Sequence, residues 1–243
     1  MVGVLAVSEL QSAGSPSGTR LVLASRSPRR RELLRAAGLD FTIHVSDIDE
    51  DLHWQKDPAG QACATARAKA LEVAEREPRD AVVIGADTIV VLNGEVFTKP
   101  EDRDHARQML RRLSGRAHTV ITGLCLARSG GPYFEEAVHA RVIFNTIGDE
   151  LLEQYIASGE PEDKAGAYGI QGLGARLVAA VEGDLTCVIG LPMRRLNMLH
   201  TRLTGRPLWN GRPLREIALG AFPDLAALPE ACLRGMDPPD ADR

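Results

Sequence analysis

The sequence predicts an α/β domain built on a mixed β-sheet, and three observations support this fold class. Segments with the period of a strand alternate with segments that have the period of a helix. Their order is irregular, unlike the strict alternation of a doubly wound parallel sheet. Two long runs rich in valine, isoleucine and threonine, at residues 119–127 and 133–146, are typical of an antiparallel hairpin. A sheet that contains such a hairpin beside parallel strands is mixed.

The first half of the chain carries clear start and stop signals. Ser27 and Pro28 are typical of a helix N-cap and a first helical position, and Gly38 is expected to close that helix. Asn93-Gly94 is a strong signal for a tight hairpin turn after an apolar run. The other elements expected here are strands at 21–24, 41–45, 81–84 and 88–92 and a helix at 58–76.

The second half is predicted in the same way. We expect helices at 102–113, 149–157 and 193–203, a strand at 175–183, and a glycine-rich loop at 164–174. After Gly205 the composition changes, because six of the fourteen prolines fall in the last 39 residues. We therefore divide the chain into a flexible leader at 1–19, a folded domain at 20–204 and a C-terminal tail at 205–243 that is at best partly ordered.

Composition limits the classes of function. At 243 residues and 44% hydrophobic content, the chain can bury a real core, as one large domain or two small ones. Its net charge of −4 argues against coating nucleic acid or an anionic membrane, so we expect neither partner. The sequence has neither an apolar run of membrane-spanning length nor a secretory signal, so a cytoplasmic location is the default. The four cysteines and six histidines lack the spacing of a zinc site.

The helix after Ser27 raises an electrostatic question. A helix N-terminus favours acidic residues, but this one carries Arg26, Arg29, Arg30 and Arg31. A phosphate-bearing ligand would supply the missing negative charge, because backbone N–H groups, hydroxyls and guanidiniums together form an anion site. The alternative is a solvated basic surface, which a protein tolerates at a cost of ~0.3–1 kcal/mol per charge.

Lysines and carboxylates supply further candidates. Only four of the 29 basic residues are lysines, which reflects a codon bias towards arginine. A lysine that persists against that bias is a candidate for contact with a phosphate or a metal-bound oxygen, which nominates Lys69, Lys99 and Lys164. Asp87 is expected on a loop at 85–88 after a buried strand, and Glu50 lies in an acidic turn. Each carboxylate either caps a turn or faces solvent, or it helps hold the Mg²⁺ that accompanies a polyphosphate.

Six motifs together carry a family resemblance. They are "LASRSPRRRELL", "IGADTIV…KP", "RQMLRRLSG", "TGLCLA", "GEPEDKAGAYGIQG" and "VIGLP". In this order and spacing they resemble the Maf family of nucleoside triphosphate pyrophosphatases over residues 20–203. The resemblance implies an inosine-triphosphatase-like α/β fold, with an elongated mixed β-sheet flanked by helices and a cleft between two lobes. It further implies a homodimer that hydrolyses a nucleoside triphosphate between the α and β phosphates, with Mg²⁺ or Mn²⁺ as a divalent metal cofactor.

The resemblance also implies roles for individual residues. The phosphate-holding positions of the family align with Ser25, Arg29 and Arg30, and Thr88 and Gln171 complete the substrate-binding set. The family's catalytic acidic residue aligns with Asp87 and its active-site lysines with Lys69 and Lys99. Its metal-associated glutamate aligns with Glu50, which would share the metal with Asp87. No GxSxG or Walker-type loop supports a serine hydrolase or a P-loop ATPase.

Three positions bear on the choice of base. Arg29, Thr88 and Gln171 are similar to the dTTP/UTP pyrophosphatase subgroup rather than to the 7-methyl-GTP subgroup. The amide of Gln171 can both donate and accept, which matches O4 and N3–H of uracil and thymine, whereas cytosine reverses that pattern. The segment "GDLTCVIGLP" departs from the family, because it lacks the aromatic residue and the asparagine common before the family's "VGLP".

Two alternatives stay open. The same enzyme could act on modified pyrimidine nucleotides such as pseudo-UTP or 5-methyl-UTP, which present the same base edge. Because the family name is tied to inhibition of septum formation, the chain could instead be a nucleotide-binding regulator in which hydrolysis is incidental. Pyrophosphate release at metal saturation would separate an enzyme from a regulator.

Overall fold

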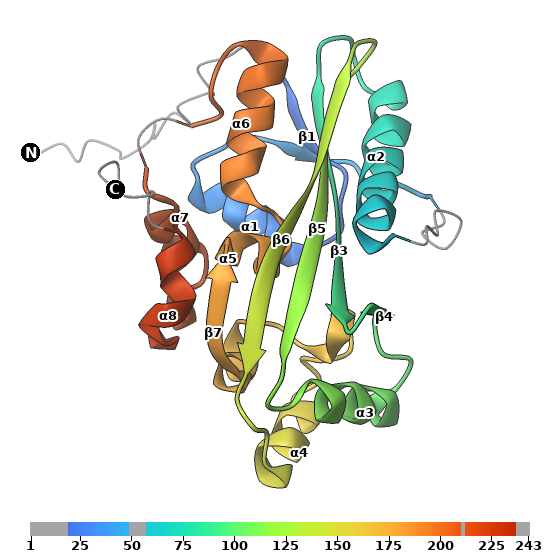
Figure 1. Ribbon diagram of the computed structural model, residues 1–243. Helices are drawn as coiled ribbons and strands as arrows, with labels where there is room; N and C mark the ends of the chain where they lie inside the picture. The colour runs from blue at the N-terminus through green and yellow to red at the C-terminus, as the bar shows by residue number, and fades with distance from the viewer. Residues whose placement is uncertain (1–18, 49–56, 210–211, 237–243) are drawn as a thin grey trace, which may run out of the picture.

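The computed structural model describes residues 19–48, 57–209 and 212–236. The expected leader, except for its last residue, and Glu50 lie outside these residues. A mixed sheet with the order β2-β1-β3-β5-β6-β7 forms the centre, and β4 pairs with the far end of β3 (Figure 1). Its strands are β1 (Leu21–Leu23), β2 (Thr42–Ile43), β3 (Val82–Leu92), β4 (Glu95–Phe97), β5 (Ala117–Arg128), β6 (Tyr133–Phe144) and β7 (Val178–Gly183).

The pairing confirms the predicted mixed sheet. β1 is parallel to β2 and β3, and all other neighbours are antiparallel. β5 and β6 form the predicted long hairpin, in register from Ala117↔Ile143 to Ala127↔Tyr133. The β3–β4 turn is also confirmed: Asn93 and Gly94 both have positive φ, of 52° and 83°. Two positive φ angles are what a two-residue turn that matches the strand twist requires.

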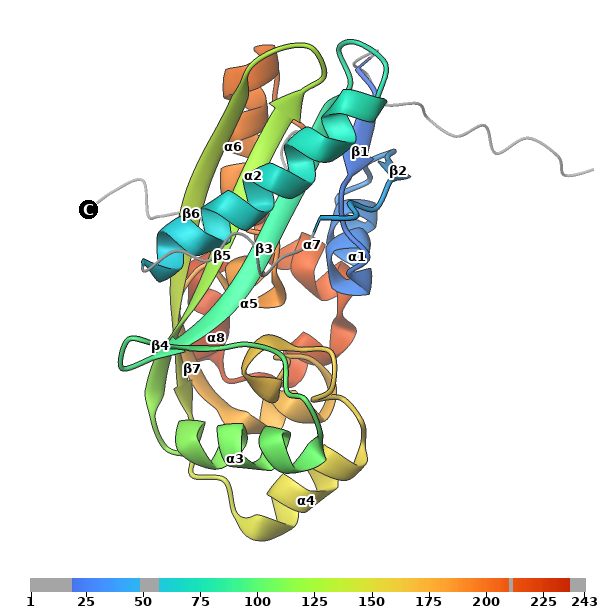
Figure 2. The same ribbon diagram turned by 90° about the vertical axis from the view of Figure 1, so that its right-hand side faces the viewer.

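Helices cover both faces of the sheet and pack against its lower end (Figures 1 and 2). α2 lies across one face of β3 and β5, whereas α1, α5, α6 and α7 lie on the other. Side chains alternate along β3, so that Val82 and Ile84 join the large core on the α1 side and Val83 joins the smaller core under α2. The helices are α1 (Pro28–Ala36), α2 (Pro58–Arg76), α3 (Arg103–Leu113), α4 (Asp149–Ala157), α5 (Leu185–Ile189), α6 (Met193–Thr204), α7 (Leu214–Ala221) and α8 (Glu230–Leu233), with 3₁₀ turns η2 (Ala165–Ala167), η3 (Gly172–Leu177), η4 (Pro223–Ala227) and η5 (Arg234–Met236).

Two glycines bring α2 unusually close to the sheet. A Cβ atom at Gly85 on β3 would lie 2.1 Å from the carbonyl oxygen of Ala66, and one at Gly123 on β5 would lie 2.1 Å from that of Ala62. No real Cβ atom tolerates such a contact, so the helix can occupy this position only over glycine. The close approach fixes the depth at which the side chains of α2 meet β3.

The expectation of a loop at 85–88 is wrong. The two predicted apolar runs belong to one strand, and β3 pairs with β5 continuously from Val82↔Arg128 to Val91↔Thr119. The sequence pattern was interrupted because Gly85 and Asp87 look like loop residues. Gly85 is instead required by the packing of α2, and Asp87 lies within the strand.

The expectation of a partly ordered tail is also wrong for residues 212–236. They form α7, η4, α8 and η5, and Leu214, Ile217 and Leu225 are buried in the main core. Three of the prolines that suggested a tail, Pro213, Pro223 and Pro229, precede or begin short helical turns, where a missing N–H and a fixed φ are tolerated. Among the residues described, no helix combines the length and the apolarity needed to cross a membrane.

Candidate active site

A cavity of about 810 Å³ opens beside the middle of β3. β1 pairs with β3 only as far as Ile84, and β4 joins β3 only from Val90 onward. The edge of β3 between these points therefore has no strand beside it in the described structure. The turn between β1 and α1, the face of α2 and the segment 163–171 surround this gap. Side chains on both faces of β3 thus reach a single cavity.

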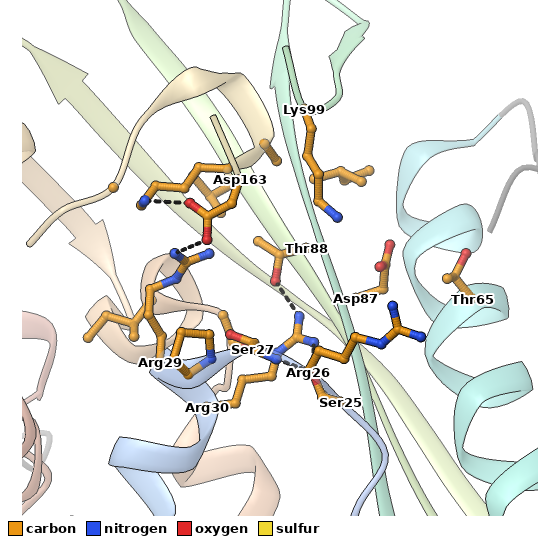
Figure 3. Close-up of a pocket in the computed structure, with 18 of the residues that line it drawn as sticks. Ser25, Arg26, Ser27, Arg29, Arg30, Thr65, Asp87, Thr88, Lys99 and Asp163 are labelled. Atoms are coloured by element: carbon orange, nitrogen blue, oxygen red, sulfur yellow. Dashed lines mark hydrogen bonds and ion pairs between the residues drawn. The ribbon is translucent and has the colours of Figure 1, made fainter. Parts of the chain in front are cut away.

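The structure brings the predicted site residues together. Eight of the nine line this cavity, several of them labelled in Figure 3: Ser25, Arg29, Arg30, Lys69, Asp87, Thr88, Lys99 and Gln171. The ninth, Glu50, lies outside the described residues. The cavity also contains residues that sequence reasoning did not assign to the site, namely Gln61, Thr65, Asp163 and Tyr168. Thr65 precedes Lys69 by one helical turn, and this spacing is the signal that could have identified it.

Arg30 is buried at the start of α1 and is held by neutral oxygens. Its Nε donates to the carbonyl of Gly190 at 2.7 Å, its Nη1 to Ser25 Oγ at 2.8 Å, and its Nη2 to Thr88 Oγ1 at 3.2 Å. Thr88 donates in turn to Thr122, at 2.9 Å, because the Thr122 hydroxyl already donates to the carbonyl of Cys187. The hydroxyl of Thr88 therefore serves to position Arg30.

Asp87 and Lys69 form the centre of the α2 side of the cavity. Lys69 Nζ lies 2.8 Å from Asp87 Oδ1, and the two side chains are 11% and 17% exposed. Thr65 is buried on the same face of α2 and lies beside Asp87 (Figure 3). This pair exists because Gly85 and Gly123 let α2 approach: Asp87 is two residues after Gly85 and directly opposite Gly123 in the β3–β5 register.

Two cations at the cavity are exposed. Lys99, just after β4, and Arg26, in the turn before α1, line the cavity and make no ion pair within the described ranges 19–48, 57–209 and 212–236. Arg29, by contrast, meets Asp163 at 3.4 Å, and Asp163 also pairs with Lys164 at 2.6 Å. Burial alone would raise the pKa of Asp163, but the hydrogen bond and charge of Lys164, together with Arg29, lower it below the usual value. Asp163 therefore stays ionised and orients Arg29.

Gln171 also lines the cavity, in a loop held from both sides. The Tyr155 hydroxyl accepts from the backbone N–H of Gly169 at 3.0 Å. Tyr168 Oη is 2.7 Å from Nε2 of the buried His118, whose pKa burial lowers to about 4. Nε2 of Gln171 is buried without a hydrogen-bond partner among the described residues. A buried donor without a partner is costly unless a ligand accepts from it.

The donor set bears on the expected metal ion. Among the residues described, no group of three or more histidine, cysteine or acidic side chains could hold a metal. Asp87 nevertheless offers a carboxylate to the cavity, and Mg²⁺ in nucleotide enzymes commonly binds through one or two carboxylates, with substrate phosphates and water as the other ligands. The residues present therefore fit a metal that arrives with a polyphosphate.

The family model described as Maf-like protein matches residues 20–203. This chain is a member of the Maf-like family. Similar proteins named dTTP/UTP pyrophosphatase include one from Pyrococcus furiosus, 47% identical over 174 residues, which are 72% of this chain and 90% of the relative. One from Moorella thermoacetica is 50% identical over 184 residues, or 74% and 93%. One from Escherichia coli O157:H7 is 47% identical over 175 residues, or 72% and 88%.

Similarity to one solved structure is weaker. A nucleoside-triphosphatase, also titled dITP/XTP pyrophosphatase, from Mycobacterium abscessus has a TM-score of 0.34 and 12% identity, covering 52% of this chain and 73% of its own. A TM-score this low does not establish a shared fold. The Maf-like match ends at residue 203, so α7, η4, α8 and η5 all lie beyond it.

Proposed function

We propose that this Maf-like protein hydrolyses dTTP and UTP to the nucleoside monophosphate and pyrophosphate. The observation that carries the proposal is the cavity beside β3, where the cations Arg29, Arg30, Lys69 and Lys99 line the same space as the carboxylate of Asp87. Relatives with 47–50% identity that are named dTTP/UTP pyrophosphatases support it. A protein that only bound nucleotides would gain nothing from a carboxylate placed among the cations that attract phosphate.

The cationic groups define the phosphate end of the cavity. The N-terminus of α1 and Arg30 provide a fixed positive wall, because Ser25, Thr88 and Gly190 hold the guanidinium in one orientation. Lys99 is exposed and opposite this wall, so it can move to meet a triphosphate. Positive charge that is already in place can stabilise the negative charge that grows on phosphoryl oxygens in the transition state.

In this proposal Asp87 accepts a proton from the attacking water and is a ligand of the metal. The ion pair with Lys69 holds one carboxylate oxygen of Asp87 and leaves the other available to the substrate. Asp87 takes a proton from the water that cleaves the bond between the α and β phosphates, and pyrophosphate leaves with the charge of the broken bond. A divalent metal, held by Asp87 and by Glu50 if that residue comes close, would neutralise phosphate charge when bound.

Gln171 defines the base end. Its amide nitrogen is buried without a protein partner, so a base carbonyl in the cavity would satisfy it. Nε2 would donate to O4 of uracil or thymine while Oε1 accepts from N3–H. Cytosine presents an amino group and an unprotonated nitrogen at the same positions, so this orientation of the Gln171 amide would leave both bonds unmade.

Pyrophosphate release from a panel of nucleotides tests the proposal. With Mg²⁺ or Mn²⁺, we expect turnover of dTTP and UTP, little of CTP, GTP, ITP or 7-methyl-GTP, and none after chelation with EDTA. Asp87→Asn should lower kcat by at least about 100-fold with nucleotide binding largely kept, since general-base catalysis alone contributes about 10²–10⁴-fold. Asp149→Asn, which changes an aspartate outside the cavity that is 89% exposed, is the matched control.

Other outcomes would contradict the proposal or favour one of the alternative functions. A full rate for Asp87→Asn would remove this residue from the mechanism. Binding of dTTP without turnover at saturating metal would favour the nucleotide-binding regulator, and faster turnover of 5-methyl-UTP or pseudo-UTP would point to modified pyrimidine nucleotides. A cytoplasmic location and a homodimer remain predictions, the second open to light scattering.

A further inference from the structure

Residues 212–236 lie beyond the family match and nevertheless contact both walls of the active-site cavity. We refer to them as the C-terminal brace. The first contact is with α1, the helix that begins with the phosphate-binding arginines. α7 packs beside α1, and Ile217 and Ala218 share a core with Leu33 and Leu34 (Figure 1). Arg212 Nη1 also donates to the carbonyl of Ala36 at 2.6 Å, at the last residue of α1.

The second contact is with the loop that carries Gln171. Asp224, in η4, accepts a hydrogen bond from the backbone N–H of Gly172 at 2.5 Å. Gly172 immediately follows Gln171 and has a φ of +63°. This positive φ favours glycine, and a Cβ atom there would also lie 2.6 Å from the Glu160 carboxylate, which would have to shift. The brace therefore holds the backbone next to the residue that is proposed to read the base.

Some side chains that hydrogen-bond to the Gln171 loop lie within the family match, and one lies beyond it. Tyr155 holds Gly169 on one side of Gln171, and Glu160 accepts from the N–H groups of residues 173 and 174 on the other. Both anchors belong to the stretch that matches the family. Asp224 accepts from the N–H group of Gly172, the residue next to Gln171. Asp224 lies outside the stretch that matches the family.

The far end of the brace is fixed as well. Cys232 and Met236 are buried, and α8 packs on β7. Gly235 lies so close to the end of β7 that a Cβ atom on it would be 1.6 Å from the carbonyl oxygen of Gly183. Asp224 thus lies between α7, which is packed on α1, and α8, which is packed on β7. The segment that carries the Asp224 carboxylate is therefore held at both ends, although the residue itself is exposed.

We propose that Asp224 is a positioning residue for base recognition, and that the C-terminal brace couples the Gln171 loop to helix α1. This inference rests on the proposed function, because it assigns a role in the discrimination of dTTP and UTP. Without the Asp224 carboxylate, the Gly172 N–H loses its acceptor and Gln171 samples orientations that do not match the base. Asp87 and Lys69 lie on β3 and α2, which are not among the main packing partners of the brace in the described structure, so the chemical step should be largely unaffected.

The test compares Asp224→Ala with Asp224→Asn, whose amide oxygen can still accept from Gly172. The matched control is Glu216→Ala, which removes an exposed carboxylate of α7 that makes no ion pair within the described residues. For Asp224→Ala, loss of one charge-assisted hydrogen bond should raise KM for dTTP and UTP by about threefold to tenfold and leave kcat within about twofold. The ratio of kcat/KM for UTP over CTP should fall, and Asp224→Asn should restore most of both.

A second readout does not depend on catalysis. Hydrogen exchange measured by mass spectrometry should be faster in peptides that cover residues 169–174 of Asp224→Ala, with the peptides of β3 and α2 unchanged. Unchanged exchange together with an unchanged KM would overturn the inference. A lower melting temperature with no change in KM would also overturn it, because that result describes a merely structural contact. If the wild-type protein hydrolyses no nucleotide, the proposed function fails, and exchange in the 169–174 peptides alone decides whether Asp224 holds the loop.

Discussion

Gly85→Ala tests the central link between packing and catalysis. The new methyl carbon would lie 2.1 Å from the carbonyl oxygen of Ala66 and 2.9 Å from the backbone nitrogen of Ala70. Ordinary carbon–oxygen contact needs more than 3 Å, so α2 must move away from β3 by about 1 Å or the strand must distort. Overpacking of this kind costs about 1–3 kcal/mol of the free energy of unfolding.

The larger effect should fall on activity. Lys69 lies between Ala66 and Ala70 on α2, and its ammonium is 2.8 Å from Asp87 Oδ1. Displacing α2 by about 1 Å lengthens this contact beyond a hydrogen bond and releases the carboxylate from its fixed orientation. Misplacement of a catalytic group by about 1 Å can lower the rate by about 100-fold. We therefore expect a loss of kcat much greater than the loss of stability would suggest.

Two measurements on the same preparation check this reasoning. Urea unfolding gives the change in stability, and pyrophosphate release from dTTP at a temperature where the variant is fully folded gives the change in kcat. Gly148→Ala is the control, because a Cβ atom there meets nothing within 4 Å and the residue is remote from the cavity. If Gly85→Ala is as stable and as active as the wild type, close approach of α2 does not position Lys69.

Two further predictions follow from buried groups of the site. Burial lowers the pKa of His118 to about 4, against about 6.5 when unfolded, so the unfolded chain binds more protons between these values and stability falls as pH drops from 6.5 to 4. The free energy of unfolding, measured with urea, should fall by about 3 kcal/mol over this range. If stability falls equally steeply with pH in His118→Gln, His118 is not the group responsible. Arg30→Lys should raise KM for UTP by about tenfold or more, because one ammonium cannot reach Ser25, Thr88 and Gly190 together; an unchanged KM would show that this geometry is dispensable.

The local sequence pattern was sufficient to predict an element wherever neighbouring residues determine its conformation. Helix α1 begins after Ser27 and ends before Gly38, whose φ is +75°, because Pro28 and the glycine act on their own backbone. The β3–β4 turn follows from Asn93-Gly94 for the same reason. The motifs spread over residues 20–203 also include eight residues that line one cavity, although they lie far apart in the sequence.

Sequence reasoning failed where the cause lies far along the chain. Gly85 looks like a loop residue, but what requires glycine there is the carbonyl of Ala66 on a helix that packs across the strand. Short helix α5 was missed because it consists of only five residues, with its cap supplied by Asp184. The role of Thr88 in base selection stays a prediction, but no local pattern indicates that its hydroxyl meets Arg30 and Thr122 from other elements.

The C-terminal segment shows the same division most clearly. Its proline content indicated a tail, because composition can show that a segment contains turns but cannot show whether those turns pack against the core. In the folded chain, Asp224 meets Gly172 across 52 positions of sequence, and Arg212 meets Ala36 across 176. The amino-acid sequence alone thus accounts for most of the elements within residues 20–203, for the Asn93-Gly94 turn and for the types of side chain that line the cavity. Only tertiary packing decides how deeply α2 lies, which oxygens hold Arg30, and that the last helices reach the active site, since these depend on contacts between distant segments.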